Sequence, residues 1–160
     1  FSLARKALFE KGGYTVDSVL PKELGTKEKL GEVLLKPHLS YWKAIKAALD
    51  QDFPLHGISH ITGGGLYDNI PRVLPANVNC VIDVDVLPPL PIFKLIEKKG
   101  KVDPAGMYRF FNMGTGMVWM VPNRKADAAL KICRQAGFVA EQIGEITKGT
   151  RKTVLPKFEG

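Results

Sequence analysis

From Leu55 to Pro75 the chain reads LHGISHITGGGLYDNIPRVLP. The part up to Thr62 has the length and the apolar content of a β-strand, and it runs directly into three consecutive glycines. A short helix is expected next, because Leu66 and Ile70 are one helical turn apart, and the following proline ends it. The segment therefore predicts a strand, a glycine turn and a helix in immediate succession.

Further strands and helices are predicted on both sides of this segment. The predicted strands are 33–35, 55–62, 79–87, 113–121 and 139–147. The predicted helices begin near Ser2, Ser40, Pro91, Pro104 and Asn123. Strands and helices alternate without a strict βαβ rhythm, so the predicted fold class is α+β, an α/β sandwich with a mixed β-sheet and helices packed on it. Residues 1–160 are expected to form a single domain.

Composition and charge exclude several classes of protein. Hydrophobic residues make up 45% of the chain and charged residues 24%, which is typical of a globular protein and not of a disordered one. No apolar run reaches the roughly 20 residues of a membrane-spanning helix, so no membrane partner is predicted. The net charge of +7 favours anionic ligands. The densest basic cluster, Lys98, Lys99 and Lys101, falls at an expected helix end, so a nucleic-acid partner is not predicted.

No metal site is predicted from this sequence. Cys80 and Cys133 are far apart and form no C-x-x-C pair, so two buried free thiols in a reducing cytoplasm are expected. Asp83 and Asp85 alternate along the predicted strand 79–87, which a solvent-facing strand face explains as well as a metal site does.

The glycine run allows two interpretations. Gly63, Gly64 and Gly65 each lose much backbone entropy on folding, so such a run serves either a tight turn or a close approach to a ligand. Backbone N–H groups of the run, with the hydroxyl of Thr62, can bind an anion such as a phosphate. The run is neither a P-loop nor a G-x-G-x-x-G fingerprint, because the residues that those motifs require are missing.

Two side chains near the glycine run are candidates for chemistry. His60 precedes the run and shares a strand face with His56 and Thr62. It can orient a phosphate or transfer a proton, although a hydrogen-bonded structural histidine fits as well. Arg72 follows the expected short helix and can contact an anion in bidentate fashion, or it can be an ordinary surface residue.

A second glycine-containing segment, FNMGTGM, covers residues 111–117. Gly114 and Gly116 alternate on one face of the predicted strand 113–121, which leaves a groove for a ligand or for a packed backbone. Asn112 stands at the start of that strand, where its side chain can contact a polar group.

These segments together resemble a known enzyme family. HITGGGLYDNIPRVLP (60–75) and MYRFFNMGTGM (107–117) are similar to two signatures of the phosphoribosylformylglycinamidine cyclo-ligases, also called AIR synthetases. FSLARKALFE, from Phe1, and LGEVLLKPHLSYW (30–42) resemble the same family, and the similarity extends to about Gly149. It implies that residues 1–160 are the C-terminal domain of such an enzyme, with the AIR synthetase C-terminal fold. Phe110 and Thr115 depart from the family pattern, but neither replaces a glycine or the asparagine.

The resemblance implies a function and partners. The expected reaction is the ATP-dependent closure of formylglycinamidine ribonucleotide to aminoimidazole ribonucleotide in purine biosynthesis. An N-terminal domain, absent from this chain, is expected to bind most of the ATP and Mg²⁺, so the chain alone is expected to be inactive. A cytoplasmic homodimer is also expected. Two alternatives are another ATP-dependent synthetase or kinase of the same superfamily, and a non-catalytic module that binds anions or nucleic acid.

The resemblance also implies roles for individual residues. Catalysis is expected of His60, which orients the reacting group. Substrate or phosphate binding is expected of Thr62, Gly63, Gly64, Gly65, Arg72, Asn112, Gly114 and Gly116.

Overall fold

The computed structural model describes residues 2–159, which form two compact units. The helical unit contains the described residues up to His38 together with Pro89–Met107. The sheet unit contains Leu39–Pro88 and the described residues from Tyr108 onward. Phe1, which opens the first segment of the family resemblance, lies outside the described residues.

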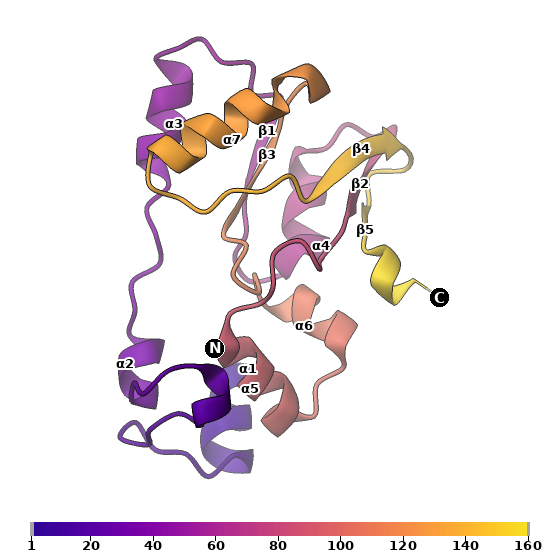
Figure 1. Ribbon diagram of the computed structural model, residues 1–160. Coiled ribbons are helices and arrows are strands. Elements are labelled where there is room, and N and C mark those ends of the chain that lie inside the picture. Colours follow the sequence, from indigo (N-terminus) through magenta and orange to yellow (C-terminus); the bar gives the residue numbers. More distant parts are fainter. Residues whose placement is uncertain (1, 160) are drawn as a thin grey trace. The chain divides into compact units, whose positions relative to one another are not determined.

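The helical unit is built on two helices that pack together, as Figure 1 shows for α1 and α5. Helix α1 (Ser2–Arg5) continues into the π-helix η1 (Lys6–Lys11). Helix α5 (Pro91–Gly100) packs against η1 so closely that a Cβ on Gly100 would lie 3.1 Å from the Cβ of Ala7. The predicted end of this helix at Gly100 is confirmed. The other helices that begin in this unit are η2 (Lys22–Leu24), α2 (Leu30–Leu34) and α6 (Pro104–Phe110).

The strand predicted at 33–35 was wrong, because Val33 and Leu34 belong to helix α2 and Leu35 is its C-cap. The Glu32 carboxylate accepts a hydrogen bond from the backbone N–H of Lys29 at 2.8 Å, which is half of a capping box. Leu30 is fully buried at the start of this helix. The apolar run was too short for its period to distinguish a strand from a helical turn, and the cap at Glu32 favours the helix.

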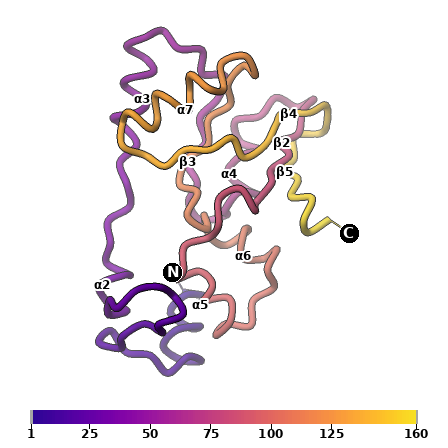
Figure 2. The backbone as a smooth tube through the Cα atoms, in the orientation of Figure 1, coloured from indigo at the N-terminus to yellow at the C-terminus, as the bar shows by residue number. Residues whose placement is uncertain are grey.

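The sheet unit contains two small sheets. Strand β1 (Gly57–His60) pairs with β3 (Met117–Met120) in antiparallel orientation. Strand β2 (Val78–Ile82) lies between antiparallel β4 (Gly144–Lys148) and parallel β5 (Thr153–Val154), as Figures 1 and 2 show. The second sheet is therefore mixed, and the predicted α+β class with a mixed sheet is confirmed.

Helices complete the sheet unit. Helices α3 and α7 lie side by side (Figure 1), and the first turn of α4 follows the glycine run directly. The hydroxyl of Thr153 donates to the carbonyl of Leu66 at 3.0 Å, which ties β5 to α4. The helices of this unit are α3 (Trp42–Leu49), α4 (Gly65–Asn69), η3 (Ile70–Val73), η4 (Asn123–Lys125), α7 (Ala126–Gln135) and η5 (Pro156–Phe158). Its largest fully buried side chains are Ile61, Leu66, Ile70, Ile82 and Leu155.

The strand predicted at 79–87 ends at Ile82. A carboxylate oxygen of Asp83 accepts a hydrogen bond from the backbone N–H of Asp85 at 2.9 Å, which turns the chain out of the sheet. Asp85 also pairs with Lys157. The prediction that Asp83 and Asp85 share a strand face was therefore wrong, because both lie in the turn beyond the strand.

The strand predicted at 113–121 is also shorter than expected. Met113 and Gly114 have positive φ angles of 55° and 105°, so strand β3 begins only at Met117. The prediction that Gly114 and Gly116 share one face of a strand was wrong, because Gly114 lies in the turn. The strand predicted at 139–147 is displaced towards the C-terminus and is observed as β4.

The two cysteines differ in exposure. Cys80 is 5% exposed, and its burial raises the pKa of its thiol to about 11. Cys133 is only half-buried on α7, so the prediction that both thiols are buried was wrong for this residue. Both cysteines are free, as expected.

None of the helices described for residues 2–159 combines the length and the apolar character that crossing a lipid bilayer requires.

Candidate functional site

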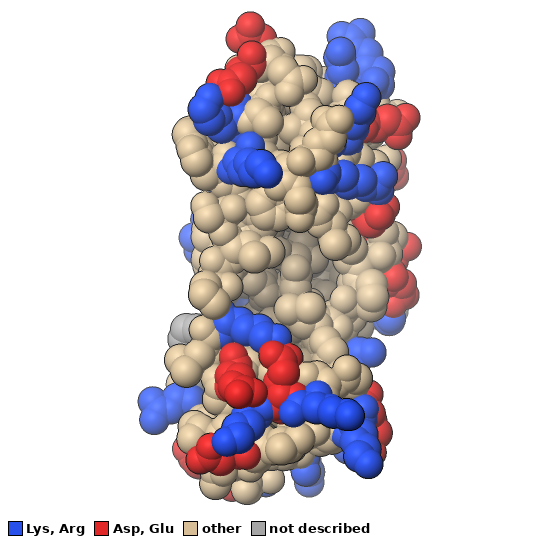
Figure 3. All heavy atoms as spheres, turned by 60° about the vertical axis from the view of Figure 1, so that its left-hand side comes forward, with Lys and Arg blue, Asp and Glu red and all other residues tan. Residues whose placement is uncertain are grey.

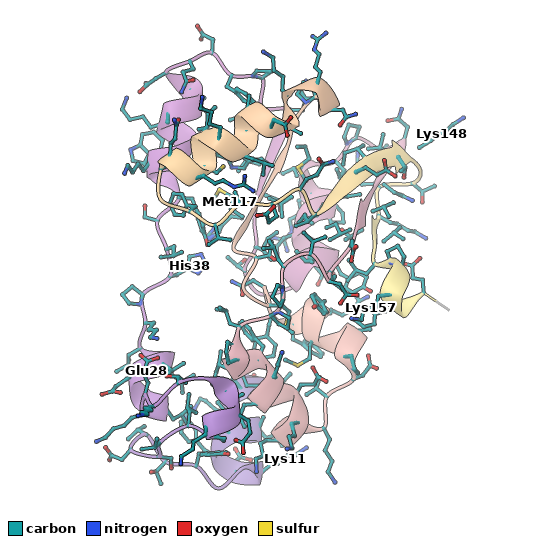
Figure 4. The ribbon with its side chains drawn as sticks, in the orientation of Figure 1. Lys11, Glu28, His38, Met117, Lys148 and Lys157 are labelled. Atoms are coloured by element: carbon teal, nitrogen blue, oxygen red, sulfur yellow. The ribbon has the colours of Figure 1, made fainter. Side chains whose placement is uncertain are left out.

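The two glycine-containing segments meet in the sheet unit. The backbone N–H of Ile61 donates to the carbonyl of Gly116 at 2.9 Å. In the same ladder His60 is opposite Met117, the side chain labelled in Figure 4. The end of β1, from which the glycine run departs, is thereby held beside the start of β3.

Gly65 is the point at which the second segment packs on the glycine run. A Cβ on Gly65 would overlap the carbonyl oxygen of Tyr108 and lie 2.7 Å from that of Phe111. The φ angle of Gly65 is +55°, and the residue is buried. Only glycine allows the end of α6 to pack directly on the start of α4.

This packing brings in Arg109, which the sequence did not single out. Its guanidinium carbon lies 5.0 Å from the ring centroid of Tyr67, in a cation–π contact. A terminal nitrogen lies 3.8 Å from a carboxylate oxygen of Asp68, and both side chains are about half exposed. The cation of α6 therefore lies beside α4, the helix that follows the glycine run. Its position inside MYRFFNMGTGM was the one sequence signal that could have identified it.

Asn69 fixes the shape of the glycine run. Its side chain is 5% exposed, and its amide nitrogen lies 2.9 Å from the carbonyl oxygen of Gly65 and 3.1 Å from that of Gly63. In a trans peptide unit the N–H points away from the C=O. The N–H groups of Gly64 and Leu66, which belong to the same peptide units, therefore point away from Asn69.

The three glycines of the run differ in what the fold demands. Gly64 has a φ of +97°, and a Cβ there would lie 2.8 Å from the Cβ of Asp68. Gly65 is required by its contact with α6. Gly63 is exposed, and a Cβ there would meet no atom within 4 Å. The packing within the described residues therefore does not explain why position 63 is a glycine.

Replacing Asn69 by aspartate is expected to destabilise the sheet unit. The substitution keeps the shape of the side chain but places a carboxylate against two carbonyl oxygens, which loses buried hydrogen bonds and adds repulsion. The expected loss is about 3 kcal/mol of unfolding free energy, measured by urea denaturation. The matched control is Asn112→Asp, because the Asn112 oxygen already accepts a bond from Gly114 N–H at 3.0 Å. Equal stability of the two variants would contradict the role of the Asn69 amide.

His60 is held by an aromatic neighbour. The rings of His60 and Tyr41 meet edge to face, with centroids 6.1 Å apart and an interplanar angle of 65°. Tyr41 packs in turn on Phe138, at a centroid distance of 5.4 Å. The phenol of Tyr41 also covers Gly116, where a Cβ would overlap the hydroxyl oxygen and lie 2.7 Å from Cζ. The groove expected over Gly116 is therefore filled by Tyr41, a residue not among the predicted site residues.

The other predicted site residues are placed as follows. Asn112 closes the turn before β3 with its side-chain oxygen, and it directly follows Phe111, whose carbonyl faces Gly65. Thr62 is exposed, and its hydroxyl lies 3.5 Å from the Asn69 side-chain oxygen. Arg72 is exposed on η3. The structure thus joins the glycine run to both ends of the second segment.

A separate cavity of about 500 Å³ lies in the sheet unit. Its walls come from α3, α7, β3 and β4 and are largely apolar, with Trp119, Leu130 and Phe138 among them. Gly63, Gly64, Gly65 and His60 are not part of its lining. Tyr41 lines this cavity and also contacts His60, so it connects the cavity wall to the candidate site.

Potential metal ligands and surface charge are the remaining features that bear on the candidate site. Within residues 2–159, no group of three or more histidine, cysteine, aspartate or glutamate side chains is arranged to hold a metal ion. On the face shown in Figure 3, lysine and arginine side chains lie among acidic ones rather than forming one continuous basic patch. The net charge of +7 is therefore not concentrated on this face.

Comparison with known proteins identifies relatives along nearly the whole chain. The family described as AIR synthase related protein, C-terminal domain, matches residues 1–157. A phosphoribosylformylglycinamidine cyclo-ligase of Bifidobacterium longum subsp. infantis is 46% identical over 155 residues, which cover 97% of this chain and 44% of the relative. Proteins of the same name from Carboxydothermus hydrogenoformans and Alkaliphilus metalliredigens are 44% and 37% identical, and the matches cover 96% and 97% of this chain.

The chain spans less than half the length of these relatives. The matched parts are 44% of the Bifidobacterium and Alkaliphilus proteins and 43% of the Carboxydothermus protein.

Proposed function

The chain belongs to the family of AIR synthase related proteins, as a C-terminal domain, and from this membership we propose that it forms the C-terminal part of the active site of a phosphoribosylformylglycinamidine cyclo-ligase. Such an enzyme uses ATP to close formylglycinamidine ribonucleotide into aminoimidazole ribonucleotide. The proposal treats residues 1–160 as one C-terminal domain that acts together with an N-terminal ATP-binding domain. It also assigns the enzyme to the cytoplasm, as a homodimer.

The convergence of the two signature segments carries the proposal. Gly65 contacts the carbonyls of Tyr108 and Phe111, and Ile61 bonds to Gly116, so the segments 60–75 and 107–117 build one surface in the sheet unit. These two segments are about 40 residues apart in the sequence and meet through tertiary packing. A shared site gives both of them a common purpose.

The proposed site binds the phosphate of the substrate at the glycine run. The N–H group of Gly64 points away from Asn69, and Gly64 is partly exposed, so we assign this N–H to the phosphate oxygens. Gly63 leaves open space above the run, as a ligand at van der Waals distance requires. Arg109, and less directly Arg72, supplies positive charge near the bound phosphate.

His60 is proposed to orient the reacting amide or to transfer its proton. In the proposed reaction the formyl oxygen takes the terminal phosphoryl group of ATP with release of ADP; an amidine nitrogen then attacks the activated carbon, gives up its proton and expels phosphate as the ring closes. Asn112 and Gly114, with Thr62, shape the wall on which the substrate lies, whereas Gly116 is covered by Tyr41 and contributes through that residue. The role of these residues is to hold the substrate in one geometry, which by itself lowers the barrier to a ring closure.

The metal is not assigned to this chain. Mg²⁺ prefers several carboxylate or phosphate oxygens in octahedral geometry, and the described residues offer no such cluster of carboxylates. The described residues therefore do not fit a Mg²⁺ site of this kind, and we place the ATP-bound metal on the N-terminal domain.

The proposal is tested by ADP release from the enzyme that carries this domain together with its N-terminal domain. Release should require formylglycinamidine ribonucleotide and should be matched by formation of aminoimidazole ribonucleotide. ADP release without the imidazole product would instead support another ATP-dependent synthetase or kinase. Salt-sensitive binding of RNA without any ADP release would support an anion-binding module.

Replacing Gly63 by alanine is expected to weaken substrate binding without destabilising the fold. The new methyl group meets no protein atom but enters the space assigned to the ligand. If it displaces one charge-assisted hydrogen bond, KM should rise roughly 10-fold to 100-fold. KM is measured by steady-state kinetics of the whole enzyme, and thermal unfolding provides the check on stability. An unchanged KM would place the substrate elsewhere.

A further inference from the structure

We propose that Tyr41 is a positioning residue that holds the imidazole of His60 in its working orientation. The inference rests on the proposed function, because it deepens the role given there to His60. It is carried by three contacts of the Tyr41 ring, all within the sheet unit.

The first contact is with His60 itself. The centroid distance of 6.1 Å and the interplanar angle of 65° are typical of an edge-to-face aromatic pair. His60 is exposed at the end of β1, where a side chain has several rotamers available. An aromatic ring at its edge favours those rotamers that keep the contact, so Tyr41 limits where the imidazole points.

The other two contacts fix the position of Tyr41. Phe138 packs against the ring at a centroid distance of 5.4 Å. Just before β3 the hydroxyl end lies directly over Gly116, so close that any side chain at position 116 would displace it. Burial raises the pKa of the phenol, so it remains neutral near pH 7 and adds no charge beside His60.

This arrangement also assigns a purpose to Gly116. Gly116 has no positive φ angle, so its conformation does not require glycine. Glycine is required here because the phenol of Tyr41 occupies the space that a side chain at position 116 would need. Tyr41 and Gly116 therefore act together, and substituting either residue should move the His60 side chain in the same way.

The test compares Tyr41→Phe, Tyr41→Ala and Gly116→Ala in the whole enzyme. Tyr41→Phe keeps the ring and should keep kcat near the wild-type value. Tyr41→Ala and Gly116→Ala should each lower kcat by about 100-fold, the effect of misplacing a catalytic group by about 1 Å, with a much smaller change in KM. The double variant should be no worse than either single one, because both act through the same displacement. Tyr14→Ala, in the helical unit, is the matched control and should retain activity.

A second readout does not depend on activity. In enzyme labelled at histidine, the His60 ring resonance is assigned by its loss in His60→Asn. It should shift in Tyr41→Ala and Gly116→Ala and stay in place in Tyr41→Phe. If Tyr41→Ala does not fold, Gly116→Ala alone decides the question.

The outcomes separate the two proposals. An unshifted His60 resonance in both Tyr41→Ala and Gly116→Ala would overturn the positioning role, whatever the enzyme catalyses. A clear shift in an enzyme without cyclo-ligase activity would overturn the proposed function and leave the contact between Tyr41 and His60 intact. A kcat loss as large in Tyr41→Phe as in Tyr41→Ala would assign the effect to the hydroxyl and overturn the positioning by the ring.

Discussion

Replacing Gly65 by alanine should strongly destabilise the sheet unit. A methyl group at this position overlaps the backbone carbonyl of Tyr108 and lies 2.7 Å from that of Phe111. Backbone atoms cannot move aside as a side-chain tip can, so α6 would have to separate from α4. The positive φ of +55° adds further strain. The expected cost exceeds about 4 kcal/mol, a large part of the 5–15 kcal/mol that stabilises a typical domain.

Two alanine variants are matched controls for Gly65→Ala. Gly137 has a φ of +95° with open space around it, so Gly137→Ala measures backbone strain alone, about 1–3 kcal/mol. Gly63→Ala has neither strain nor a clash and should unfold like the wild type. Circular dichroism during thermal and urea unfolding measures all three. If Gly65→Ala were no less stable than Gly137→Ala, the close packing of α6 on α4 would be refuted.

Replacing His60 by asparagine should lower kcat by roughly 100-fold to 10,000-fold, the usual contribution of a general acid or base. Folding should be unaffected, because the imidazole is exposed at the end of β1. Asparagine is also compact and polar, so it introduces no new apolar surface. Steady-state kinetics on the whole enzyme, with aminoimidazole ribonucleotide as the measured product, provides the value.

His56→Asn is the matched control for this substitution. His56 is also exposed, and its backbone N–H bonds to the carbonyl of Met120 at the opposite end of the β1–β3 ladder. Because this bond does not involve the side chain, the control should keep nearly full activity. A similar loss in both variants would mean that strand β1, rather than the imidazole of His60, is what the reaction requires.

Local patterns were enough to predict much of the chain around the glycine run. The strand before it, the helix after it and the helix ended by Gly100 follow from short-range signals: apolar spacing, proline and glycine. The same signals failed where a side chain competed with the strand. Asp83 and Asn112 each bond to a backbone N–H two residues ahead, and each bond ends or delays a strand that the apolar pattern had extended.

The family, too, was accessible from the sequence, because signature segments are local strings of residues that survive without any knowledge of the fold. The resemblance to the cyclo-ligases rested on HITGGGLYDNIPRVLP and MYRFFNMGTGM. The family match over residues 1–157 agrees with it. The role of each site residue stays a prediction.

Tertiary structure decided which residues accompany the glycine run. Arg109 reaches Asp68, and Tyr41 reaches His60 and Gly116, only because segments distant in sequence pack together. It also showed that the three glycines of the run are needed for different reasons, which the sequence cannot show because all three residues are identical. A contact between distant segments depends on how the whole chain folds, and no periodicity or motif within one segment records it. The sequence by itself therefore determined the local elements and the family, whereas the neighbours of each candidate residue came from the fold.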